Sequence, residues 1–163
     1  MKWLGLSIVI VILDQLTKFL VIQNLKLHQS IEIFSWFDLT LIHNTGAAFS
    51  FLSQAGGWQR WFFIILAITI STIITIWLLR LPAKQRWLAC ALALVLGGAV
   101  GNLWDRIMFG YVVDFINVSI SFLPWRLFNP WPAFNIADSA ISVGAVMLII
   151  DAIINREKKN QIE

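Results

Sequence analysis

The sequence predicts an all-α membrane protein, a four-transmembrane-helix bundle with a small β-sheet and loop platform on its outer surface. Of the 163 residues, 59% are hydrophobic and only 13% are charged, whereas roughly a quarter of the residues in soluble domains are charged. A chain of this size cannot hide so much apolar surface inside a globule. The apolar residues also gather into four runs, each near the roughly 20 residues that cross a bilayer as a helix.

The four runs place the predicted spans at about residues 3–22, 58–79, 87–109 and 134–154. Tryptophans cluster near the ends of these runs, as expected of aromatic belts at the membrane surfaces; they are Trp58, Trp61, Trp77, Trp87, Trp104 and Trp131. The first run resembles a signal peptide, but it is longer than a typical apolar signal region and no small-x-small cleavage site follows it. We therefore expect an uncleaved anchor, and a single membrane domain over residues 1–163.

The distribution of Lys and Arg predicts the orientation of the bundle. Seven of these residues lie at the two termini and in one short connection, namely Lys2, Arg80, Lys84, Arg86, Arg156, Lys158 and Lys159. The remaining five are spread over longer segments, and two of them, Lys18 and Arg106, belong to apolar runs. The positive-inside rule then places both termini in the cytoplasm. The long connections 23–57 and 110–133 face outward.

The outward connections are not featureless. Residues 30–43 are rich in Ile, Phe, Trp and Leu and partly alternate, which predicts one or two short strands. Residues 118–122 alternate cleanly and predict another strand, while Asn44-Thr45-Gly46 has the chemistry of a turn. We expect a small sheet on the outer membrane surface, with its apolar face toward lipid.

Two carboxylates mark the outer ends of the last two apolar elements. Asp114 follows the third span, Asp138 opens the fourth, and the proline-rich segment 124–132 separates them. Charged carboxylates in apolar surroundings are costly, and a close pair of them is the minimal equipment for general acid–base hydrolysis. We therefore expect Asp114 and Asp138 to form a catalytic pair that shares one proton. Which of the two holds that proton stays open, as does the alternative of a helix-terminal charge and a loop residue.

Other polar residues in the spans are predicted to lie at the same depth. Asp14 and Lys18 are four apart, as are Asn102 and Arg106, and Asn135 lies three before Asp138, so each pair shares one helix face. Ionisable residues inside a membrane span are candidates for a functional role. The Asp14–Lys18 pair either serves the site or only locks helix packing. Asp105 is interpreted as an interfacial residue that points away from the cluster.

Several classes of site are disfavoured by composition. The single cysteine, Cys90, allows no internal disulfide, and the two histidines, His28 and His43, lie far from it and from each other. A metal site is therefore not expected. The net charge of +3 is modest and its basic residues are scattered, which indicates loops at a membrane surface and not a nucleic-acid partner.

Four blocks of the sequence, in this order, resemble the bacterial lipoprotein signal peptidases, also called type II signal peptidases. The blocks are HNTGAAFS at 43–50, GGAVGNLWDR at 97–106, VVDF at 112–115 and FNIADS at 134–139. The similarity covers essentially the whole chain, and no block departs from the family pattern.

The resemblance implies a membrane aspartic endopeptidase that removes the signal peptide from diacylglyceryl-modified prolipoproteins, cutting just before the lipidated cysteine. It places the catalytic pair on Asp114 and Asp138. The supporting positions are Asp14, Lys18, Asn44, Gly46, Asn102, Arg106 and Asn135. The family needs no metal or organic cofactor and is blocked by the cyclic peptide globomycin. We expect a monomer among membrane lipids of the bacterial inner membrane, with its active site near the outer, periplasmic leaflet.

Two rival functions use the same residues differently. An ion- or proton-coupled transporter would also hold Asp, Lys, Asn and Arg in a bundle, but a transport path needs polar groups on both sides of the membrane. A purely structural subunit would make Asp114 and Asp138 individually dispensable. The predicted gathering of all these groups at one depth favours the peptidase.

Overall fold

Four long helices dominate the computed structural model, which describes residues 2–46, 56–119 and 131–160. They are α1 (Lys2–Asn24), α2 (Trp58–Arg80), α3 (Arg86–Met108) and α4 (Ile136–Asn160). Each is long and apolar enough to cross a membrane. The predicted four-helix membrane bundle is confirmed.

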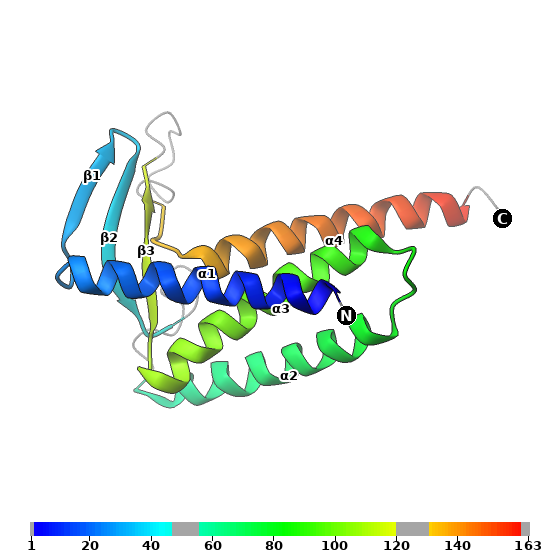
Figure 1. Ribbon diagram of the computed structural model, residues 1–163, viewed down its shortest axis with the longest axis horizontal. Helices are drawn as coiled ribbons and strands as arrows, with labels where there is room; N and C mark the ends of the chain where they lie inside the picture. Colours follow the sequence, from blue (N-terminus) through cyan, green and yellow to red (C-terminus); the bar gives the residue numbers. More distant parts are fainter. Residues whose placement is uncertain (1, 47–55, 120–130, 161–163) are drawn as a thin grey trace.

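The α3 helix is the centre of the bundle and packs against the other three helices (Figure 1). In α3, half of the residues in the most apolar 18-residue stretch are buried, compared with about a fifth in the corresponding stretch of each other helix. Small residues allow this close packing, because they let two helix backbones approach each other. At Gly98 the approach is closest: an added Cβ would lie 2.3 Å from the carbonyl oxygen of Ala137 on α4.

The outward faces of the helices are apolar, as expected of surfaces that meet lipid. Large hydrophobic side chains with high exposure occur along α1, α2 and α4, for example Phe19, Ile65 and Ile149. Exposed tryptophans mark both ends of the bundle, with Trp61 and Trp104 at one end and Trp87 at the other. This arrangement fits a bilayer-spanning bundle with aromatic belts at two levels.

A three-stranded antiparallel sheet covers one end of the bundle. Its strands, in the order β1 (Ser30–Phe34), β2 (Phe37–Asn44) and β3 (Val112–Val118), run across the helix ends (Figure 1). The register pairs Ile42 with Asp114 and Asn44 with Val112. The start of α1 and the end of α4 lie at the opposite end of the bundle (Figure 1). The predicted sheet platform is therefore confirmed.

The third strand differs from its prediction. The strand at Val112–Val118 was not predicted, and it shares only Val118 with the strand predicted at 118–122; residues 120–122 of that prediction lie outside the described part of the chain. The strand was missed for a physical reason: Val112–Phe115 is buried on both faces, and such a strand shows no alternation in its sequence. Phe134 is not helical but bridges Ile116 on β3, so α4 begins two residues later than predicted.

Candidate active site

Asp114 enters the site from β3, where it is 2% exposed. Burial of a carboxylate requires hydrogen-bond donors, and two asparagine amides supply them. Asn44 Nδ2 on β2 donates to Asp114 Oδ2 over 2.9 Å, and Asn135 Nδ2 donates to Asp114 Oδ1 over 2.8 Å. The strand pairing and the two amides together fix the direction of this carboxyl group.

Asp138 enters from the first turn of α4. Asn135 is the N-cap of this helix: its Oδ1 accepts from the backbone N–H of Asp138 over 2.9 Å, and its own N–H donates to Asp138 Oδ2 over 3.2 Å. This reciprocal pair of bonds is a capping box. Asn102 Nδ2 on α3 donates to the other oxygen, Oδ1, over 2.7 Å. Asp138 is thus both a helix cap and a member of the site.

The two asparagines connect the aspartates to each other. Asn135 Nδ2, which binds Asp114, also lies 3.2 Å from Asn102 Oδ1, and Asn102 Nδ2 binds Asp138. Both asparagines are buried, with Asn135 fully inaccessible. A continuous chain of hydrogen bonds therefore runs from one aspartate to the other.

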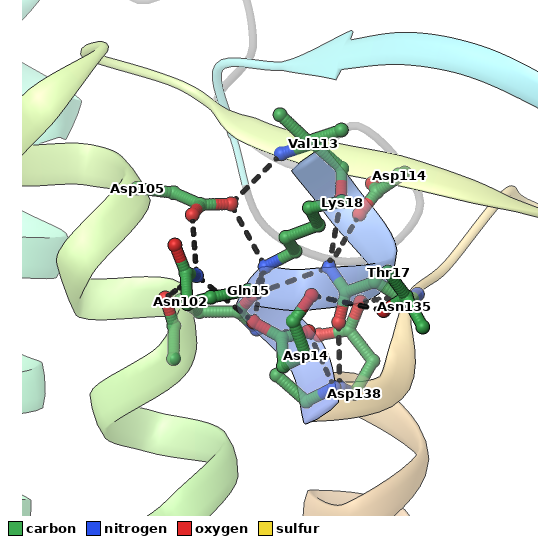
Figure 2. A network of polar contacts seen from close by, with 12 residues as sticks. Asp14, Gln15, Thr17, Lys18, Asn102, Asp105, Val113, Asp114, Asn135 and Asp138 are labelled. Carbon is green, nitrogen blue, oxygen red and sulfur yellow. Dashed lines mark hydrogen bonds and ion pairs between the residues drawn. The ribbon is translucent and has the colours of Figure 1, made fainter. Parts of the chain in front are cut away.

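Beneath this pair lies a buried cluster of charges centred on Lys18. Its Nζ lies 2.8 Å from Asp14 Oδ2 and 2.8 Å from Asp105 Oδ2, and it donates to Asn102 Oδ1 over 3.1 Å (Figure 2). All three charged side chains are almost completely buried. The predicted pairing of Asp14 with Lys18 is confirmed, and the pair is in direct contact with the site.

Asp14 also holds the start of α4. Its Oδ1 accepts from the backbone N–H of Ala137 over 2.9 Å, which satisfies a free donor in the first turn of that helix. The helix dipole favours negative charge there. The space beside Asp14 needs Gly101, because an added Cβ would come within 2.7 Å of Asp14 Oδ2.

The prediction that Asp105 is an interfacial residue pointing away from the polar cluster is wrong. Asp105 is fully buried and forms an ion pair with Lys18. The sequence did contain a signal for this position, because Asp105 lies three residues after Asn102. Residues three apart share a helix face, just as residues four apart do. Gln15 was also missed; its Nε2 donates to Asp105 Oδ1 over 2.8 Å and to Asp14 Oδ2 over 3.1 Å.

Arg106 connects the helices to the turn after β2. Its Nη2 donates to the carbonyl oxygen of Gly46 over 3.0 Å, and its guanidinium lies 5.0 Å from the centre of the Phe63 ring. The predicted turn at 44–46 is present, with the Gly46 N–H donating to Asn44 Oδ1 over 3.0 Å. Gly46 and Arg106 thus support Asn44, which in turn binds Asp114.

A cavity of about 530 Å³ opens at this end of the bundle. Its polar wall contains both aspartates together with Asn44, Asn102 and Arg106. Its apolar lining is formed by Val112, Trp131, Pro132, Ala133, Phe134, Ile141 and Val143, and Ser139 and Ser142 also line it. Burial and the nearby charge of Asp138 raise the pKa of Asp114 to about 7, against the opposing effects of Asn44, Lys18 and Asn135.

The arrangement provides a buried carboxyl group that titrates near neutrality beside a second carboxyl group, a combination suited to general acid–base chemistry. All nine residues predicted for the site lie together in this network. Among the described residues, no three His, Cys, Asp or Glu side chains are grouped as a metal site.

Comparisons with known proteins agree with this geometry. The family model described as signal peptidase (SPase) II matches residues 6–154. Two relatives named lipoprotein signal peptidase are 47% identical over 161 residues in Alteromonas mediterranea and 51% identical over 166 residues in Pseudomonas aeruginosa. These alignments cover 99% and 98% of this chain, and 85% and 91% of the relatives.

A solved structure, described as a bacterial membrane enzyme determined by the in meso method at 2.3 Å resolution, has the same fold. Its TM-score is 0.84 at 30% sequence identity, over 97% of this chain and 91% of that one. The family match spans nearly the whole chain, including every residue of the site. The chain therefore belongs to the signal peptidase II family.

Proposed function

We propose that this chain is an aspartic endopeptidase that removes the signal peptide from diacylglyceryl-modified prolipoproteins, cutting just before the lipidated cysteine. The observation that carries the proposal is that Asp114 and Asp138, which come from separate elements, line one cavity and are joined by asparagine amides. Family membership supports the substrate class, because the relatives are named lipoprotein signal peptidases.

The catalytic pair works with one shared proton. Burial and the charge of Asp138 raise the pKa of Asp114 to about 7, which favours Asp114 as the holder of the shared proton, while Asp138 lies in the first turn of α4, where the helix dipole favours a negative charge. Asp138 then takes a proton from the attacking water. Protonated Asp114 polarises the scissile carbonyl and later supplies a proton to the leaving amine. Arg106 and Asn44 border the same cavity and orient the substrate.

The apolar lining of the cavity suits a lipidated substrate. Trp131, Phe134, Ile141 and Val143 provide apolar surface beside the polar wall. A signal helix and two acyl chains can lie against this surface while the scissile peptide reaches the aspartates. The lipid on the cysteine is therefore part of what the enzyme recognises.

We place this family member in the bacterial inner membrane, and the distribution of Lys and Arg supports an orientation with both termini in the cytoplasm and the active site near the outer leaflet. The sheet and the site lie at the bundle end opposite the start of α1 (Figure 1), in agreement with that orientation. The chain acts as a single-domain monomer in contact with membrane lipids, without a nucleic-acid partner. Globomycin is the expected inhibitor.

The transporter alternative finds no support. The buried ionisable side chains of the described residues are Asp14, Lys18, Asp105 and Asp114, and all four belong to the network beneath the sheet. A path for ions through the membrane would also require polar groups in the opposite half of the bundle.

The test is cleavage of a purified prolipoprotein in detergent, followed as a gel shift. The diacylglyceryl-modified form should lose its signal peptide, and the unmodified form should be cut poorly or not at all. Globomycin should stop the reaction, whereas a chelator should not, because the two carboxyl groups supply the acid and the base. Failure of the folded protein to cut the lipidated form would refute the proposed function.

A further inference from the structure

Asp105 is a buried ionisable residue that the proposed chemistry does not use. It is fully inaccessible and does not line the cavity. Its Oδ2 lies 2.8 Å from Lys18 Nζ and accepts from the Val113 N–H over 3.1 Å, and its Oδ1 accepts from Gln15 Nε2 over 2.8 Å. Both oxygens are therefore fixed by partners on other elements.

Helix stability does not explain an aspartate at this position. Asp105 lies in the last turn of α3, which ends at Met108, and the helix dipole disfavours negative charge at a C-terminal end. A buried charge is also costly unless it is paired. The residue must therefore be explained by what it contacts.

The first contact leads to Asp114. Asp105 accepts a hydrogen bond from the N–H of Val113, the residue directly before Asp114, and Asn135 Nδ2 donates to the carbonyl oxygen of Val113 over 3.2 Å. Val113 is itself fully buried. The backbone N–H and C=O of Val113, directly before Asp114, are thus both hydrogen-bonded to side chains of other elements.

The second contact leads to Asp138. Lys18, held between Asp105 and Asp14, donates to Asn102 Oδ1, and Asn102 Nδ2 donates to Asp138 Oδ1 (Figure 2). With its Oδ1 occupied by Lys18, the amide of Asn102 can present only its NH₂ group to Asp138. Asp105 thereby acts on both members of the pair from a position outside the cavity.

We propose that Asp105 is a positioning residue of this peptidase, which aligns Asp114 through the Val113 N–H and Asp138 through Lys18 and Asn102. The inference rests on the proposed function and adds to it a residue that does not touch the substrate. It also gives the α1 helix a part in catalysis, because Lys18 and Gln15 are the α1 partners of Asp105.

The charge of Asp105 also affects the proton of the pair. The charged groups around it are Asp14 and Lys18 from α1, Arg106 from α3, Asp114 from β3 and Asp138 from α4. Replacement of Asp105 by Asn removes one negative charge, while Asp14 still pairs with Lys18. The cluster of two carboxylates around one ammonium thereby loses its excess negative charge, which favours the ionised form of the pair, so the shared proton is lost at lower pH.

The experiment measures kcat, KM and the pH profile of prolipoprotein cleavage for the wild type, Asp105→Asn and a control, Asp151→Asn. The control makes the same chemical change at a residue of α4 whose partner, Asn155, lies far along the chain from the site. Asp105→Asn should lower kcat by about 10²-fold with little change in KM, and should move the alkaline limb of the profile to lower pH. Asp151→Asn should match the wild type.

A folded Asp105→Asn protein with wild-type kcat and pH profile would overturn the inference. So would a loss of activity that only follows the folded fraction, measured by circular dichroism, with an unchanged pH profile. If Asp105→Asn does not fold, Gln15→Leu decides: it changes no charge and removes the 2.8 Å donor to Asp105 Oδ1, together with the longer bonds of 3.1 and 3.2 Å to Asp14 Oδ2 and the Gly101 carbonyl oxygen. A reduced kcat with an unchanged KM supports the inference, and a wild-type kcat refutes it. Inactivity of the wild type would instead refute the proposed peptidase.

Discussion

The two halves of the bundle are held together by different interactions. At the sheet end, the helices are connected by ion pairs and side-chain hydrogen bonds among buried groups. At the opposite end, α2 and α3 meet in an apolar cluster of Ile74, Leu78, Ala89, Leu92, Ala93 and Leu96. Two described polar links join helices at that end: the Ser7 hydroxyl donates to the carbonyl oxygen of Ala93 over 2.8 Å, and the Trp87 indole N–H donates to the carbonyl oxygen of Met147 over 3.0 Å.

Under the proposed function, the difference separates a half of the bundle that serves stability from a half that serves chemistry. Apolar helices gain little by leaving lipid, because the acyl chains are as apolar as leucine, so the opposite half depends on close packing. The sheet end retains buried charges, and an apolar replacement of such charges is often as stable or more so. Its residues are therefore better explained by the reaction than by the fold.

The largest expected effect comes from the proposed catalytic pair at the sheet end. Asp114→Asn and Asp138→Asn should each lower turnover by about 10²–10⁴-fold or more, because Asn keeps the size of Asp but cannot exchange a proton. Both proteins should fold, since each change removes one of two crowded carboxyl groups. Cleavage of the lipidated prolipoprotein and circular dichroism in detergent measure the two quantities. A folded variant that retains a tenth or more of wild-type turnover would contradict the shared-proton mechanism.

Sequence reasoning predicted the membrane bundle well because length and apolarity decide it. The apolar spans end within two residues of their predicted limits, since a bilayer demands about the same length from every helix, although the α4 helix itself continues to Asn160. Spacing within one helix also predicted that Asp14 and Lys18 share a face. The resemblance to the signal peptidases brought together residues such as Asn44 and Asp138, which no local pattern connects.

Contacts between elements could not be predicted in the same way. The environment of Asp105 depends on Lys18 from α1 and on Val113 from β3, and neither is visible from α3 alone. The strand containing Asp114 was missed because a strand buried on both faces has no alternation to detect. Both errors concern positions where tertiary contacts, and not local periodicity, decide the structure.

A smaller effect is expected where the packing of α3 meets the polar network. In Gly101→Ala, the new Cβ lies 2.7 Å from Asp14 Oδ2, so Asp14 must shift, which disturbs its contacts with Lys18 and with the N–H of Ala137 at the start of α4. We expect overpacking to cost about 1–3 kcal/mol and turnover to fall about 10-fold or more, because small misplacements near a site are costly.

Gly144→Ala is the matched control for Gly101→Ala. Its Cβ would lie 2.7 Å from Val95 Cγ2 and 2.8 Å from the carbonyl oxygen of Ala91, a clash with fixed backbone that is at least as severe and that contacts no residue of the polar network. Thermal unfolding in detergent should show destabilisation of both variants, whereas turnover per folded molecule should fall only in Gly101→Ala. Equal losses of turnover would contradict the separation of the two halves.

In the apolar half, Leu92→Ala should affect stability alone. Leu92 is 1% exposed, and its truncation leaves a cavity that costs about 1–3 kcal/mol, less than in a soluble core because the helix surface is solvated by lipid when it separates. The control Ile65→Ala alters a side chain that is 64% exposed toward lipid and should change stability little. Loss of turnover in folded Leu92→Ala would show that the apolar half also shapes the site.

The smallest effect is a shift in pH dependence at Asn44. Its amide donates to Asp114 Oδ2 and thereby lowers the pKa of Asp114, against the larger effect of burial. Asn44→Ala removes this donor, so the pKa of Asp114 should rise above about 7 and the alkaline limb of the cleavage profile should move to higher pH. One hydrogen bond of about 1 kcal/mol corresponds to less than about one pKa unit.

The shift to higher pH expected for Asn44→Ala is opposite to the shift expected for Asp105→Asn. The first change removes a donor to the charged carboxylate, and the second removes a competing negative charge. Rate–pH profiles of the two variants beside the wild type measure both shifts, and shifts in the same direction would show that at least one of these residues acts on the pair by a different route.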